Sequence, residues 1–123
     1  MILCSGRITW DLMVERNKRQ KDTVTTAIAR VEQLYPRPTE EIKHELSRYP
    51  NLKKVRWVQD EPLNMGPAPH FRVNLFPALD VDVEVISRPE SSSPSVGQHS
   101  RHVQEQRDLM DQAFAAATPS PGA

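Results

Sequence analysis

The chain has 123 residues, enough for one domain with its own hydrophobic core and too few for two. Its 16 basic and 16 acidic side chains balance, which argues against nucleic acid as a partner. Its apolar runs are far shorter than the roughly 20 residues of a membrane-spanning helix, and its one cysteine excludes an internal disulfide bond. We therefore expect a cytoplasmic domain that binds neither nucleic acid nor membranes.

The N-terminal residues combine a strand pattern with a helix pattern. Met1–Cys4 is a short apolar run closed by Ser5-Gly6, which predicts a buried strand and a tight turn. Residues 8–19 predict a helix, and the side chains expected to face the core are those of Ile8, Leu12 and Val14. Because the first core strand begins at Met1, we expect the chain to be a separate or truncated part of a longer protein.

The same alternation continues along the next segment. Val24–Leu34 contains several β-branched residues and predicts a second strand. Thr39–Tyr49 predicts a second helix, which Thr39 is expected to cap. Glu40 and Glu41 lie in its first turn, where the helix dipole favours acidic side chains.

The rest of the chain predicts two further strands and two helices. The strands cover Lys54–Gln59 and Val81–Ser87, and a short helix is expected over Pro69–Leu75. The last helix is expected over Gln98–Ala116. The residues after it, 117–123, are interpreted as a disordered tail.

Strands that alternate with helices are typical of a mostly parallel sheet with helices on both faces. The sequence therefore predicts one α/β domain over residues 1–116. Its architecture is expected to be a three-layer α/β/α sandwich whose sheet has about four strands.

Residue types that carry chemistry form no complete set. His99 and His102 are three residues apart, but no Cys, Asp or Glu at a recognisable spacing completes a metal site. Asp60 and Glu61 follow a strand, yet adjacent side chains on an extended segment point in opposite directions, so a polar loop is favoured over a catalytic pair. Cys4 lies in an apolar strand without a histidine partner. We therefore expect no catalytic residue, cofactor site or metal site in this chain.

Four blocks of sequence carry a resemblance to a known family: LCSGR at 3–7, ARVEQLYPRP at 29–38, RYPNLKKVRWVQDEPLNMG at 48–66 and SRPESSSPSVG at 87–97. The chain resembles the C-terminal region of the thiamine diphosphate-dependent dehydrogenase component of the 2-oxoglutarate dehydrogenase complex, a tricarboxylic acid cycle enzyme. Multifunctional actinobacterial forms belong to the same group. The similarity runs from Leu3 to about Phe114.

The resemblance implies a transketolase C-terminal-domain-like fold. In the parent enzyme, thiamine diphosphate and magnesium lie between the two preceding domains, across a dimer interface that the C-terminal domain supports. This chain would therefore bind no cofactor, since it lacks that pocket. Its role would be structural, and its partner would be itself or a chain that carries the thiamine diphosphate-binding domains.

Two departures from the family pattern concern contacts with other molecules. The family's Asn-Gln-Gly-Ala-Trp is replaced by Asn64–Ala68, and we expect the missing Trp to remove an anchor from a contact surface. Some actinobacterial relatives bind acetyl-CoA through the glutamine that corresponds to Gln33 and through two arginines. Glu40 and Glu41 occupy the arginine positions, so we expect this site to be absent or weak.

An alternative hypothesis is a regulatory module that binds a small ligand, either acetyl-CoA or a nucleotide. Open α/β sheets bind ligands beyond the carboxyl ends of their strands. The candidate ligand-binding residues at that edge are Ser5, Gln33, Gln59 and Asp60. An independent enzyme is the weakest hypothesis, because no nucleophile and base form a recognisable set.

Overall fold

The computed structural model describes residues 1–32, 38–89 and 99–115. Its four strands form one parallel sheet in the order β2-β1-β3-β4. The strands are β1 (Ile2–Cys4), β2 (Ile28–Arg30), β3 (Val55–Pro62) and β4 (Val83–Arg88). The helices are α1 (Ile8–Arg19), α2 (Thr39–Ser47), α3 (Ala68–Asn74) and α4 (His99–Ala113), and the 3₁₀ helix η1 (Phe76–Leu79) follows α3.

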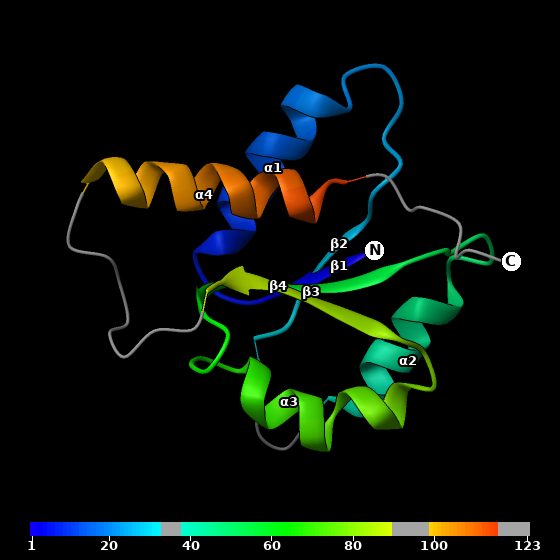
Figure 1. Ribbon diagram of the computed structural model, residues 1–123. Helices are drawn as coiled ribbons and strands as arrows, with labels where there is room; N and C mark the ends of the chain where they lie inside the picture. The colour runs from blue at the N-terminus through cyan, green and yellow to red at the C-terminus, as the bar shows by residue number, and fades with distance from the viewer. Residues whose placement is uncertain (33–37, 90–98, 116–123) are drawn as a thin grey trace, which may run out of the picture.

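Helices cover both faces of the sheet, with α1 and α4 on one side and α2 and α3 on the other (Figure 1). Successive side chains of a strand point to opposite faces, so β1 contributes Leu3 to one core and Cys4 to the other. In the same way β3 contributes Trp57 to the first core and Val58 to the second. The predicted α/β fold with a parallel four-stranded sheet is confirmed, whereas the transketolase-like label stays a prediction.

An aromatic cluster fills the core under α2 and α3. The Trp57 ring meets the Phe71 ring edge to face, with the centroids 5.1 Å apart, and Phe76 lies 6.2 Å from Trp57. All three side chains are buried. Such edge-to-face pairs add to the free energy gained by burying the rings. Trp57 thus fixes the position of α3 against the sheet.

Several local expectations were wrong in detail. Val24 is 60% exposed and precedes β2, which is shorter than the predicted strand. Val14 faces away from the core and is 55% exposed. The residue at the N-cap position of α2 is Pro38, so Thr39 is the first helical residue and does not cap the helix. The length of a strand, the exposure of a side chain and the first residue of a helix depend on tertiary packing. Local residue preferences do not reveal that packing.

In the described ranges, no helix is long and apolar enough to cross a membrane. The predicted tail, residues 117–123, lies outside the described residues. The proposed domain boundary at residue 116 also falls there and stays a prediction.

Candidate functional site

The carboxyl end of β3 is organised by one buried amide, that of Gln59. Its Oε1 accepts hydrogen bonds from Trp57 Nε1 at 3.0 Å and from the backbone N–H of Ala68 at 2.9 Å. Its Nε2 donates to the backbone oxygens of Pro62 at 2.9 Å and Met65 at 2.8 Å, with a longer contact to that of Glu61. A primary amide offers two donors and one acceptor oxygen, so the bonding capacity of Gln59 is filled from within the domain.

These bonds shape the turn that joins β3 to α3. Gly66 has a φ of +66° in that turn, a conformation that residues with a Cβ rarely adopt. The Ala68 N–H that binds Gln59 belongs to the first turn of α3, where helical N–H groups have no partner within the helix. Gln59 therefore satisfies the start of α3 as a capping side chain would.

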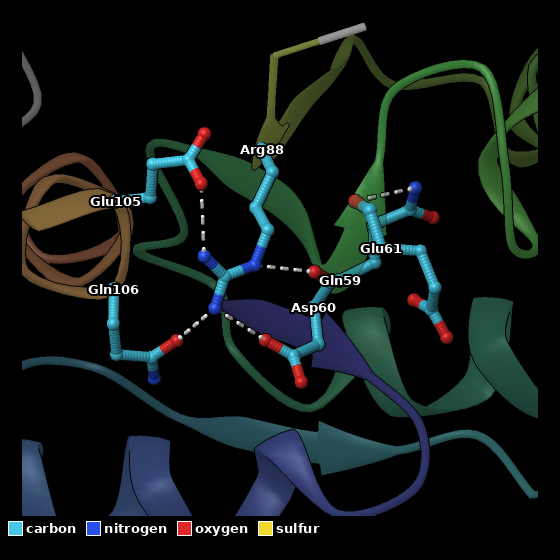
Figure 2. A network of polar contacts seen from close by, with 6 residues as sticks. All are labelled: Gln59, Asp60, Glu61, Arg88, Glu105 and Gln106. Carbon is cyan, nitrogen blue, oxygen red and sulfur yellow. Dashed lines mark hydrogen bonds and ion pairs between the residues drawn. The ribbon is translucent and has the colours of Figure 1, made fainter. Parts of the chain in front are cut away.

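A second polar network surrounds Arg88 at the end of β4 (Figure 2). Its Nε donates to the backbone oxygen of Asp60 at 2.9 Å, and Nη2 donates to the Asp60 carboxylate at 3.2 Å and to Gln106 Oε1 at 2.9 Å. Nη1 lies 3.4 Å from the Glu105 carboxylate on α4. The side chain is only 5% exposed. A buried guanidinium thus ties β3, β4 and α4 together through two carboxylates and two neutral acceptors.

The sequence patterns did not predict the Arg88 network, although they contain one signal for it. That signal is an arginine at the end of a strand that contains Val83, Val85 and Ile86. An arginine that is buried in such a strand needs polar partners to offset its loss of hydration. Its partners on α4, Glu105 and Gln106, lie 17 and 18 residues further along the chain. Periodicity within one element does not reveal such distant partners.

Asp60 and Glu61 point away from each other, as expected for neighbours on an extended segment (Figure 2). Asp60 turns toward Arg88 and pairs with it. Glu61 turns toward Gly66, where an added Cβ would lie 3.0 Å from the Glu61 carboxyl carbon. The two carboxylates therefore do not face one another across a reacting group.

Ser5 directly follows β1. Leu3 of β1 pairs with Trp57 of β3, and Ser5 and Gln59 each lie two residues further on, so both reach the same edge of the sheet. Among the described residues, no hydrogen bond joins Ser5 to Gln59 or Asp60. Gln33 lies outside the described residues. A ligand role for these four residues stays a prediction, and at Gln59 a ligand would compete with the internal bonds.

A hollow of about 400 Å³ lies between β2 and α2. Among the described residues, the charged side chains that line it are Glu32, Glu41, Glu45 and Arg30. Arg30 is paired with Glu32, which reduces its attraction for other anions. Carboxylates repel phosphate groups, so the three described glutamates of this hollow disfavour acetyl-CoA or a nucleotide there.

The Cys4 thiol is buried beside Thr9, with 3.4 Å between sulfur and hydroxyl. Burial raises the pKa of the Cys4 thiol above its ordinary value, although the hydrogen bond with Thr9 acts in the opposite direction. A thiol with a raised pKa is a poor nucleophile at neutral pH. In the part of the chain that the structure describes, no three His, Cys, Asp or Glu side chains lie close enough to hold a metal ion.

The fold and these two networks define an α/β domain in which the side chains of Gln59 and Arg88, near the carboxyl edge of the sheet, bind groups of the domain itself. The chain belongs to the 2-oxoglutarate dehydrogenase C-terminal family, whose profile matches residues 1–114. The predicted family is therefore confirmed.

Similar proteins include the multifunctional 2-oxoglutarate metabolism enzyme of Mycobacterium sp. (strain KMS), 39% identical over 94% of this chain and 9% of the relative. The 2-oxoglutarate dehydrogenase E1 component of Cupriavidus necator is 38% identical over 94% of this chain and 12% of the relative. The 2-oxoglutarate dehydrogenase E1 component of Exiguobacterium sp. is 35% identical over 100% of this chain and 13% of the relative. The chain thus spans about a tenth of the length of these relatives.

The structure places the two departures from the family pattern in different surroundings. Ala68, where the family pattern has a Trp, is fully buried in the aromatic core. The expectation that this position lies on a contact surface is therefore wrong for this chain. Glu40 and Glu41 are exposed in the first turn of α2, as expected for acidic residues at a helix N-terminus.

Proposed function

We propose that this chain acts as the C-terminal structural domain of a 2-oxoglutarate dehydrogenase component in the cytoplasm, and that it supports a dimer without performing the reaction itself. The family match over residues 1–114 carries this proposal. The internal bonding of Gln59 and Arg88 supports it, because these groups are occupied in holding the fold.

Decarboxylation of 2-oxoglutarate would then require a partner chain that carries the cofactor-binding domains. Thiamine diphosphate and magnesium would be held by that chain. The length of the relatives supports this division, because this chain matches only about a tenth of each of them. This chain would contribute a rigid surface that completes the assembly.

Co-purification with the polypeptide that carries the cofactor-binding domains tests this proposal. We expect the tagged chain to retain that polypeptide and to increase its rate of 2-oxoglutarate decarboxylation. An unrelated α/β domain of similar size, with the same tag, is the control. Absence of both association and rate increase would exclude the proposed role.

A further inference from the structure

A cavity of about 600 Å³ opens at the amino end of the sheet, opposite the edge that holds Gln59 and Asp60. Its lining includes the start of β1, residues 25–27 before β2 and residues 48–54 before β3. Residues 113–115, where α4 ends, also line it. Its volume falls within the range of cavities that bind small molecules. The size of the cavity therefore suits a small-molecule ligand.

The charged side chains of this cavity have one sign. Among the described residues, those that line it are Arg48, Lys53, Lys54 and Arg56, and none is acidic. The whole chain, by contrast, carries 16 basic and 16 acidic side chains. Two carboxylates lie close to these cations without lining the cavity: Glu45 pairs with Arg48, and Glu84 pairs with both Lys54 and Arg56. Basic groups thus outnumber their acidic neighbours by four to two.

Arg56 is the most buried of these cations, with only 11% of its side chain exposed. Its Nε pairs with Glu84 at 3.1 Å, and its Nη1 donates to the backbone oxygens of Ala113 at 3.0 Å and Ala115 at 2.7 Å. These bonds hold the guanidinium at the wall of the cavity. Its Nη2 makes no hydrogen bond within the described residues, so it is a fixed donor that a negatively charged acceptor can bind.

Helix ends explain some of the cations at this edge, because the helices that cover a parallel sheet end there. Arg56 binds the last carbonyl groups of α4, and Arg48 is the C-cap residue of α2. Lys53 is different, because it lies beyond the last turn of α2, is exposed and makes no ion pair within the described ranges. The effect of the helix dipole falls off within the last turn. Helix ends therefore do not account for Lys53, whereas an anionic ligand does.

We propose that this cavity binds a small molecule through a phosphate or diphosphate group. Lys54 Nζ and Arg56 Nε approach the same Glu84 oxygen, at 3.4 Å and 3.1 Å, so these two cations converge on one point. A phosphate group concentrates about two negative charges and three acceptor oxygens on one centre, whereas the charges of a dicarboxylate are separated. Four basic groups less two carboxylates leave two positive charges, which match such a group. This inference goes beyond the proposed structural role and does not rest on it.

Isothermal titration calorimetry of the full chain with inorganic diphosphate, in a buffer without magnesium, tests the site. We expect saturable one-to-one binding that weakens about fivefold or more in Lys53→Met, because this variant removes a charge that no described carboxylate neutralises. Lys43→Met is the matched control, since the Lys43 side chain is 39% exposed on α2 and does not line the cavity. Absence of saturable binding up to about 10 mM diphosphate, or an equal loss in Lys43→Met, would overturn the proposal.

Glu84→Gln tests whether Lys54 and Arg56 take part. Loss of this carboxylate frees both cations for the ligand, so we expect diphosphate to bind about threefold or more tightly. Glu40→Gln controls for the loss of one negative charge, since Glu40 is exposed at the start of α2 and does not line the cavity. If Glu84→Gln binds diphosphate no more tightly than Glu40→Gln, the assigned position of the anion is wrong.

Two further measurements test the class of ligand and its place. Succinate, a dicarboxylate, should bind about fivefold or more weakly than diphosphate, and equal affinity would overturn the phosphate assignment. In amide nuclear magnetic resonance spectra, diphosphate should shift the signals of residues 48–54 most. Shifts centred on residues 5–6 and 59–61 would place the anion at the carboxyl edge and overturn this site. Because these titrations contain no partner polypeptide, their outcome is independent of the co-purification that tests the proposed function.

Discussion

Arg88 on β4 binds Asp60 on β3 through two of its nitrogen atoms, at 2.9 Å to the backbone oxygen and at 3.2 Å to the carboxylate. The same guanidinium reaches Gln106 on α4. This one side chain therefore replaces backbone pairing at a point where the β3–β4 register shifts, between Val58 and Pro62. It also anchors the last helix to the edge of the sheet.

We expect Arg88→Met to lower the free energy of unfolding by about 2 to 3 kcal/mol, because it leaves Glu105 half-buried without its cation. Urea denaturation monitored by circular dichroism measures the loss. Arg101→Met is the control, since Arg101 is exposed on α4, and it should change stability by less than about 0.5 kcal/mol. Equal losses in the two variants would show that the network contributes nothing specific.

Gln59→Leu should destabilise the domain by about 2 to 4 kcal/mol, because Trp57 Nε1, the Ala68 N–H and two carbonyl oxygens lose their partner in a buried site. Near-ultraviolet circular dichroism should also change, since the Trp57 ring loses its orientation. Gln104→Leu, on the exposed side of α4, provides the comparison. A Gln59→Leu variant as stable as Gln104→Leu would contradict the scaffold role.

Ala68→Trp tests whether this position belongs to the core. Ala68 is fully buried, so we expect the indole to overpack the cluster around Trp57 and Phe71 and to cost about 2 to 3 kcal/mol. Val73→Trp, at an exposed position of the same helix, should be nearly neutral. If thermal unfolding shows that both variants match the unmodified chain, then position 68 accepts a large side chain at the surface.

The Cys4 thiol should make stability depend on pH under alkaline conditions. Burial raises the pKa of Cys4 in the folded state above the value of about 8.5 expected when the chain is unfolded. Its contribution to stability is therefore complete below the unfolded pKa and declines as pH rises past it. Cys4→Ser should lack this part of the decline between about pH 8 and 10 in urea titrations. Parallel profiles for the two proteins would contradict the effect.

Local patterns in the sequence were sufficient to predict the fold class and most of the elements. The spacing of apolar residues over 8–19 predicted a helix with the same bounds as α1, because helical periodicity is a property of neighbouring residues. The alternation of strands and helices predicted the parallel sheet, because the order of the elements can also be read from local patterns. The blocks ARVEQLYPRP and WVQDEP pointed to the family that the comparison confirmed.

Only the tertiary structure decided which polar side chains act together. The sequence placed Gln59 and Asp60 at the end of a strand, but it did not show that Gln59 turns inward to the start of α3 while Asp60 turns outward to Arg88. It likewise did not show that Ala68 is in the core and Val14 at the surface. These outcomes depend on contacts between residues far apart in the chain, and the physical reason is that burial is fixed by how helices pack on the sheet.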